Sequence, residues 1–187
     1  MEQVKTDEKN KLTEKQKMIL YFFVYAFLGW ILETIFCIVT TGTFTKRGFL
    51  YGTLCPIYGF GAIILIQCLK SIKANTIGKF FIAMISFTIF EYIASAILED
   101  IFGLRWWDYS NDAFNFQGRI SLAYSIAWGI LGVIFVEKIH PNFEKRIEPK
   151  VNRFSNITQN IVLYMLSGIT LVDFILSIIK YLKVWYY

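Results

Sequence analysis

The chain has 187 residues, of which 56% are apolar and only 18% are charged. A soluble domain carries about 25% charged residues, so this composition excludes an ordinary soluble protein. The formal net charge of +5 does not indicate a nucleic-acid partner, because in an apolar chain the placement of the basic residues matters more than their sum.

Apolar stretches long enough to cross a bilayer recur along the chain and predict an all-α fold, a polytopic bundle of transmembrane helices. A polar segment, residues 1–17, precedes them. It lacks the apolar core and small-residue cleavage site of a signal peptide, and we interpret it as a cytoplasmic tail before a single transmembrane domain, residues 18–187. The predicted spans are residues 18–40, 54–69, 80–102, 120–136 and 161–182.

The second predicted span is short and contains Pro56, Gly59 and Gly61, so we expect it to be irregular at its outer end. With five spans, the tail and the second and fourth loops share one side of the membrane. That side holds 13 of the 19 basic residues. Because basic loops are retained in the cytoplasm, we predict a cytoplasmic N-terminus and an outer C-terminus.

Six-residue segments of the first and third spans are nearly identical. Residues 31–36 read ILETIF and residues 97–102 read ILEDIF, an offset of 66 residues that aligns Glu33 with Glu99. Each segment is followed by an outer loop with adjacent glycine and arginine residues. This pattern predicts two helical hairpins in parallel orientation, followed by a fifth helix. The alternative is coincidence among residues that are abundant here.

Three acids lie within the predicted spans: Glu33, Glu91 and Asp173. A charged side chain at such depth costs several kcal/mol and usually faces the bundle interior. These acids are therefore candidates for binding an ion, a proton or a substrate. The alternative is that each is paired or protonated and only fixes helix packing. Glu99 and Asp100 lie nearer the membrane surface, where placing a charged side chain costs less free energy.

The outer loops contain more polar and aromatic residues than membrane anchoring alone requires. The second reads RWWDYSNDAFNFQGRISL, and we expect it to form an ordered, re-entrant loop whose backbone groups bind protein partners. Glu33, Arg47, Asp108 and Arg119 are expected to converge in one outward-facing polar cup. The alternative is that the tryptophans and tyrosines anchor the chain at the lipid headgroups.

Several signals of other functions are absent from the sequence. It has no phosphate-binding GxxxxGK[ST] motif, no HExxH motif and no Cys/His cluster with metal-ligand spacing. The sequence therefore predicts no metal site and no ATPase within the chain, and it identifies no cofactor. Cys37 and Cys55 both lie near the outer side, where they can pair or serve as small buried apolar residues.

The two loop blocks, KRGFLYGTLCPIYGFG and WWDYSNDAFNFQGRISL, resemble the ABC-transporter type IV (CmpB-like) family of integral membrane proteins. The resemblance extends over most of the chain, from the first to the fourth span. It implies a permease-like subunit of a bacterial plasma membrane and identifies neither a substrate nor a catalytic residue. The matching positions are Glu33, Arg47, Gly48, Pro56, Tyr58, Gly59, Glu99, Trp107, Asp108, Tyr109, Ser110, Asn115, Gly118 and Arg119.

Two functions follow from these observations, besides the less specific one of an accessory scaffold for a larger complex. The first is a small transporter or permease component, which would need a separate ATPase or permease partner or self-association. The second is a membrane-embedded enzyme or lipid-binding protein acting at the outer leaflet, with Asp108 or Glu33 as a general acid or base; of the two, the sequence favours the non-enzymatic function. The candidate substrate- or ion-binding residues are Glu33, Arg47, Tyr58, Glu91, Glu99, Trp107, Asp108, Tyr109, Asn115, Arg119 and Asp173.

Overall fold

A computed structural model describes residues 10–185, which form two compact units. The first unit consists of residues 10–63 and 141–180, and the second of residues 64–140 and 181–185. Of the predicted tail, residues 1–9 lie outside the described residues.

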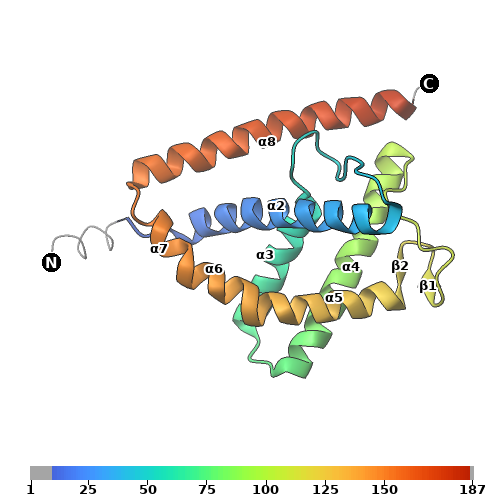
Figure 1. The fold of residues 1–187 in the computed structure, drawn as a ribbon, viewed down its shortest axis with the longest axis horizontal. Coiled ribbons are helices and arrows are strands. Elements are labelled where there is room, and N and C mark those ends of the chain that lie inside the picture. Colours follow the sequence, from blue (N-terminus) through green and yellow to red (C-terminus); the bar gives the residue numbers. More distant parts are fainter. Residues whose placement is uncertain (1–9, 186–187) are drawn as a thin grey trace. The chain divides into compact units, whose positions relative to one another are not determined.

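In the described part of the chain, four helical segments are long and apolar enough to cross a membrane (Figure 1). They are α2 (Glu14–Thr41), α4 (Thr76–Phe102), the run Leu122–Val151, and α8 (Asn156–Trp185). The remaining predicted span is the shorter helix α3 (Pro56–Ser71). The predicted bundle of apolar helices is thus confirmed, and the protein is an integral membrane protein.

The run Leu122–Val151 is longer than the predicted span 120–136. It consists of α5 (Leu122–Ile134), a π-helical turn η1 (Phe135–Ile139), α6 (His140–Arg146) and the short α7 (Glu148–Val151). Helices α2, α4 and α8 each begin four or five residues earlier than predicted, because polar residues cap their first turns. The caps are Thr13, Asn75 and Ser155, whose side chains accept backbone N–H groups at 3.3, 2.8 and 3.2 Å.

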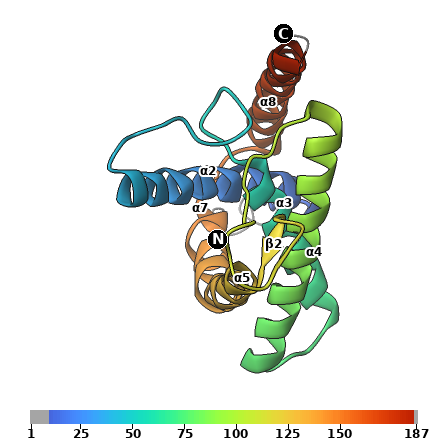
Figure 2. The same cartoon turned by 90° about the vertical axis from the view of Figure 1, so that its right-hand side faces the viewer.

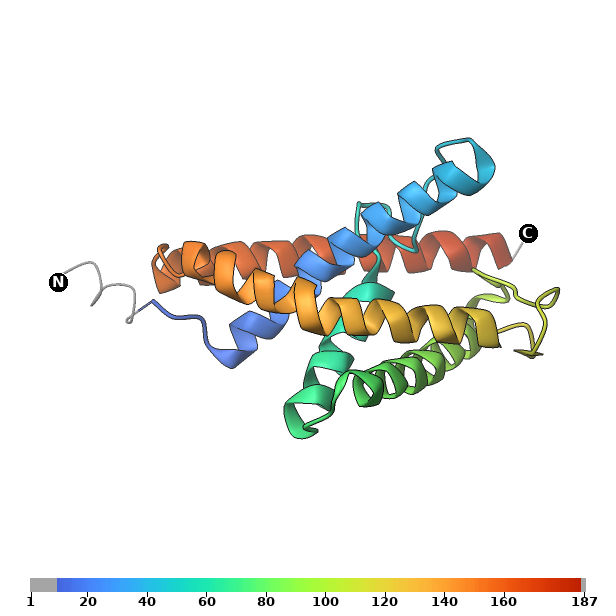
Figure 3. The same cartoon turned by 60° about the horizontal axis from the view of Figure 1, so that its bottom comes forward.

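Exposed isoleucines occupy every fourth position along the second half of α4: Ile85, Ile89, Ile93, Ile97 and Ile101, each between 48% and 54% exposed. Residues four apart are neighbours on a helix surface, so these side chains form an apolar stripe that winds slowly around α4. A continuous apolar stripe of this length would aggregate in water and is a surface expected to contact lipid. Helix α4 also packs against α5 (Figure 3).

The segment between α2 and α3, residues 42–55, runs back along α2 instead of leaving it (Figure 1). Helix α2 ends at Gly42, which adopts the left-handed conformation (φ 71°), and the Cys55 N–H then donates to the carbonyl of Ala26 at 3.0 Å. Ala26 lies 15 residues before Thr41, about 22 Å along the helix axis. Helix α3 therefore begins near the middle of α2, and we call residues 42–55 the re-entrant segment.

Two glycines permit the close crossing of α2 and α3. A Cβ atom on Gly59 would lie 2.8 Å from the carbonyl oxygen of Phe22, and one on Gly29 would overlap the ring of Tyr58. Small residues of this kind allow transmembrane helix backbones to approach closely.

The second unit repeats this arrangement. Helix α4 ends at the left-handed Gly103, and residues 103–121 form a hairpin with the short antiparallel strands β1 (Asn115–Phe116) and β2 (Ile120–Ser121), seen in Figure 2. Helix α5 then begins deep along α4, where the hydroxyls of Thr88 and Ser125 lie 2.8 Å apart. Thr88 is 14 residues, about 21 Å, from the end of α4.

The 66-residue offset of the predicted repeat relates the corresponding positions in the two units. Four pairs of residues 66 positions apart agree in local structure. Pro56 and Leu122 are the first helical residues, and Gly48 and Phe114 are both left-handed. The other two pairs are Gly59 with Ser125 and Phe22 with Thr88, because Gly59 contacts Phe22 just as Ser125 contacts Thr88. Because these matches are local geometries rather than common residue types, they favour a genuine repeat over coincidence.

The first turns of α2 and α8 lie side by side in the first unit. The Gln16 side-chain amide donates to Asn160 at 2.7 Å, and the Leu12 N–H donates to Asn152 at 3.2 Å. Both helices therefore begin at the same level.

Candidate functional site

The predicted site residues fall into two main polar groups, one in each unit. The Glu33 group, in the first unit, consists of Glu33, Arg47 and Tyr58. The hairpin group, in the second unit, consists of Glu99, Arg105, Asp108 and Arg119.

In the Glu33 group, each carboxylate oxygen of Glu33 accepts one donor. Arg47 Nη2, from the re-entrant segment, lies 3.1 Å from Oε2, and the Tyr58 hydroxyl, from the first turns of α3, donates to Oε1 at 2.5 Å. The side chains of Arg47 and Glu33 remain 38% and 27% exposed. A partly accessible carboxylate, guanidinium and phenol thus meet where α3 begins, which is a set of groups that can orient a small polar ligand.

Asp173, the predicted acid of the fifth span, binds the backbone of the re-entrant segment. Its two carboxylate oxygens accept the N–H groups of Tyr51 and Gly52, each at 2.7 Å, and Ser177 donates to it at 3.2 Å. Irregular backbone at membrane depth needs such protein partners. Asp173 therefore supports the segment that carries Arg47.

The hairpin group is centred on Glu99. Arg105 Nε lies 2.9 Å from Oε1, and Arg119 Nη1 lies 2.6 Å from Oε2. Arg119 Nη1 also approaches the Ser95 hydroxyl at 3.3 Å. The Nε atom of Arg119 is buried and has no hydrogen-bond partner among the described residues, which is unusual for a buried donor.

Asp108 lies in the hairpin and accepts hydrogen bonds from Ser110, at 2.5 Å from the hydroxyl and 2.9 Å from the backbone N–H. These bonds, and then the charge of Arg105 at 3.7 Å, hold the pKa of Asp108 below its usual value. The hydrogen bond to Glu99 raises the pKa of Arg105. The acid is thus ionised, and the arginine beside it is Arg105, which was not among the four residues expected to form the polar cup.

Other motif residues fold the hairpin itself. Asn115 donates to the Asp112 carbonyl at 2.8 Å and accepts from the Gly118 N–H at 3.0 Å. Gly118 is left-handed (φ 67°), and a Cβ there would lie 2.6 Å from Asp108. The Trp107 indole N–H donates to the Arg119 carbonyl at 3.0 Å. The spacing of this motif is therefore explained by the hairpin.

Tyr109 links the hairpin to the interior of α4. Its hydroxyl donates at 2.9 Å to Glu91, which is only 5% exposed and also accepts the Trp128 indole N–H at 3.1 Å. The Tyr109 ring stacks on Tyr124, with centroids 4.3 Å apart. Glu91 is thus a buried acid held by one residue of the motif and one residue of α5.

One cluster was not predicted from the sequence. Lys17 lies 3.1 Å from Glu148, and the Tyr21 hydroxyl donates to Glu148 and also lies 3.3 Å from a carboxylate oxygen of Glu144. The only sequence signal is that each pair, Lys17 with Tyr21 and Glu144 with Glu148, has the spacing of one helix face. The roles of Arg105 and Trp128 were also missed.

The three cysteines, Cys37, Cys55 and Cys68, are free thiols, so the structure has no Cys37–Cys55 disulfide. No group of three or more His, Cys, Asp or Glu side chains suited to a metal ion occurs in residues 10–185.

A model of the family described as "Putative ABC-transporter type IV" matches residues 20–178, which is most of the chain. Neither the curated proteins nor the solved structures include a match to the chain.

Proposed function

The chain belongs to the ABC-transporter type IV family, and we propose that it is the membrane-embedded, permease-like component of a transport system. Its polar sites would face the outer side, with the N-terminus in the cytoplasm of a bacterial cell. The 13 basic residues of the tail and of the second and fourth loops support this orientation.

The observation that carries the proposal is the re-entrant segment. It places irregular backbone and the start of α3 at the level of Ala26, deep along α2. Interrupted helices that begin near the middle of the bilayer are typical of transporters, where they form substrate and ion sites. The Glu33 group lies at such an interruption, so we assign the first polar contact with the substrate to Glu33, Arg47 and Tyr58.

The chain would not supply the energy for ABC-type transport itself. Its 187 residues contain no phosphate-binding GxxxxGK[ST] motif. We therefore propose that a separate ATPase subunit binds the protein in the membrane.

The test is substrate-dependent ATP hydrolysis and uptake by the protein purified from its own membrane together with its partners, in vesicles. Small cations, anions and neutral solutes are offered as separate classes. We expect Arg47→Gln and Glu33→Gln each to reduce uptake at least tenfold. The matched control is Asp100→Asn, which removes an exposed acid of α4. Uptake that is equal in all three variants would place the substrate site elsewhere.

A lipid-binding or enzymatic role at the outer leaflet is the second candidate. It is favoured by the hairpin tip, where Phe114 and Phe116 are 82% and 56% exposed. A groove of about 540 Å³ beside it is lined by Asn111, Asp112, Ala113, Ala123, Tyr124 and Ala127. If the purified protein alters or retains a lipid in a manner that depends on Asp112 but transports nothing, this second function is the correct one.

A further inference from the structure

Four basic side chains lie at the end of the first unit where α2 and α8 begin, and we call them the basic patch: Lys145, Arg146, Lys150 and Arg153. We propose that the basic patch binds the anionic headgroups of the adjacent membrane leaflet. The proposal goes beyond transport, because it needs neither a substrate nor an ATPase.

All four side chains of the basic patch are exposed. None of them forms an ion pair in the part of the chain that the structure describes. Of the two acids on the same helices, Glu148 is 8% exposed and pairs with Lys17, whereas Glu144 is exposed and lies 3.3 Å from the Tyr21 hydroxyl. Four exposed basic side chains thus face one exposed acid on these helices, so the exposed charge of this end remains positive.

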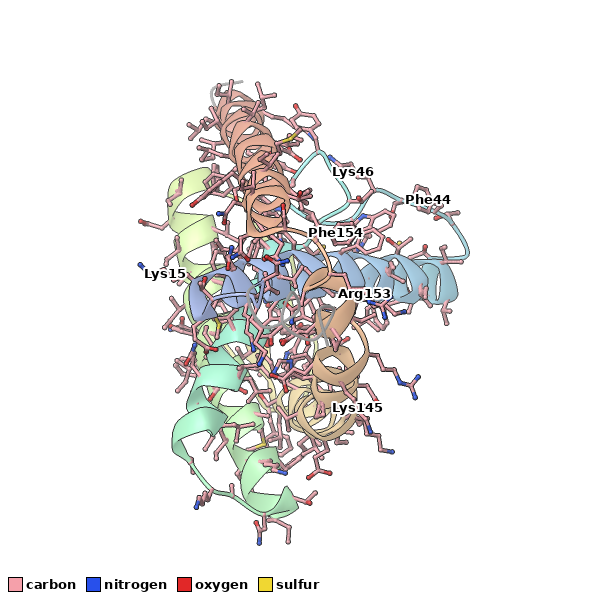
Figure 4. All side chains as sticks on the ribbon, turned by 90° about the vertical axis from the view of Figure 1, so that its left-hand side faces the viewer. Lys15, Phe44, Lys46, Lys145, Arg153 and Phe154 are labelled. Carbon is pink, nitrogen blue, oxygen red and sulfur yellow. The ribbon has the colours of Figure 1, made fainter. Side chains whose placement is uncertain are left out.

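The basic patch lies at the level of the lipid headgroups. The contact between Gln16 and Asn160 aligns the starts of α2 and α8, both of which are long enough to cross the bilayer. The patch occupies the connection that leads into α8, so its height in the membrane is fixed by these helix starts. Figure 4 views this end and labels Lys145 and Arg153, together with Lys15 of α2.

Exposed apolar side chains accompany the charges. Phe154 is 58% exposed and Ile157 is 73% exposed, and Ile147, on the connection between α6 and α7, is 37% exposed. A surface that combines basic residues with aromatic and aliphatic ones, at the end of membrane helices, matches a leaflet whose phosphates are negative and whose boundary is apolar. An acidic protein surface would satisfy the charges, but it would not account for the apolar residues at the same height.

The experiment uses the full-length protein with Phe154→Trp as a fluorescent reporter, in mixed micelles with brominated phosphatidylglycerol or brominated phosphatidylcholine. The signal of the reporter is the fluorescence of the Phe154→Trp protein minus that of the unmodified protein under the same conditions. We expect several-fold stronger quenching by the anionic lipid, which falls towards equality in 0.5 M salt. Lys150→Gln/Arg153→Gln should reduce the ratio of quenching by the anionic lipid to quenching by phosphatidylcholine to near one. The matched control, Lys73→Gln/Lys138→Gln, removes two exposed charges of the second unit and should leave this quenching ratio unchanged.

Thermal unfolding of each variant establishes that it is folded, and Lys145→Gln/Arg146→Gln provides an independent second pair. Equal quenching by the two lipids in the reporter protein, or a preference that survives both pairs of substitutions, would overturn the proposal. Binding of an acidic soluble protein that depends on the patch, without any lipid preference, would assign the surface to a protein partner instead.

Discussion

The backbone N–H of Cys55 donates a hydrogen bond to the carbonyl oxygen of Ala26, 3.0 Å away and near the middle of α2. This bond fixes how deep the re-entrant segment descends before α3 starts. It explains why α3 has only 16 residues, which is short for a helix that crosses a bilayer alone. The segment and the helix together are long enough to span it.

The first prediction concerns the side chain that holds the re-entrant segment. Asp173→Ala removes a charged acceptor from two backbone N–H groups, each of which is then left at membrane depth. Hydrogen bonds to charged groups contribute about 1.5–3 kcal/mol each. We expect a loss of about 3 kcal/mol in the free energy of unfolding, measured by thermal unfolding in detergent.

Asp173→Asn retains one oxygen acceptor and should cost less than Asp173→Ala. If Asp173→Ala unfolds at the temperature of the unmodified protein, the two hydrogen bonds do not hold the segment in the membrane.

The second prediction uses two glycines that differ in their surroundings. A Cβ on Gly59 would meet the Phe22 backbone at 2.8 Å, whereas a Cβ on Gly168 of α8 would meet nothing within 4 Å. Overpacking costs about 1–3 kcal/mol, and Gly→Ala in an open helix position stabilises by up to about 1 kcal/mol. Gly59→Ala should therefore lower the unfolding temperature in detergent, and Gly168→Ala should maintain or raise it. Equal effects would contradict the close crossing of α2 and α3.

The third prediction is the number of membrane crossings. Helices α2 and α8 begin at the same level, so an even number of crossings separates their starts. Three long segments, α2, α4 and Leu122–Val151, lie between these points. If each crosses once, the re-entrant segment with α3 must provide the fourth crossing, which makes five in total with α8.

Single cysteines in a cysteine-free background measure these crossings on intact cells. Ala113→Cys, at the hairpin tip, should react with an impermeant reagent, whereas Lys15→Cys and Lys73→Cys should react only after permeabilisation. Reaction of Lys15→Cys and Lys73→Cys from opposite sides would mean that α3 does not cross the membrane.

The sequence predicts the helices better than it predicts their contacts, and the reason is physical. Apolar length identifies the spans, and glycines such as Gly42 and Gly103 mark helix ends because only glycine adopts the left-handed conformation without strain. The depth to which a loop descends is set by partners such as Asp173, more than 120 residues away. No local pattern contains that information.

The sequence likewise does not show which charged residues pair with one another. The pairing of Glu33 and Glu99 with arginines of the following loops agrees with the repeat. Which arginine faces Asp108 depends on the hairpin, whose two-residue strands are too short to be recognised from alternation.

The last prediction compares two ion pairs of the hairpin group. Arg119 and Glu99 have side chains that are 16% and 29% exposed, with 2.6 Å between the charged atoms, whereas Asp108 is 52% exposed and lies 3.7 Å from Arg105. A partly buried, closely spaced ion pair is screened less by solvent than an exposed one, which contributes little to stability. Glu99→Gln should therefore destabilise the protein more than Asp108→Asn does.

A double-mutant cycle separates the pair from its surroundings. Because Glu99→Gln leaves the mostly buried Arg119 uncompensated, adding Arg119→Gln should restore part of the lost stability, so the two substitutions should be coupled rather than additive. The measurement is thermal unfolding in detergent of the two single variants and the double variant. Strictly additive losses would show that Arg105 alone neutralises Glu99, and that Arg119 carries its charge for another purpose, such as contact with the substrate.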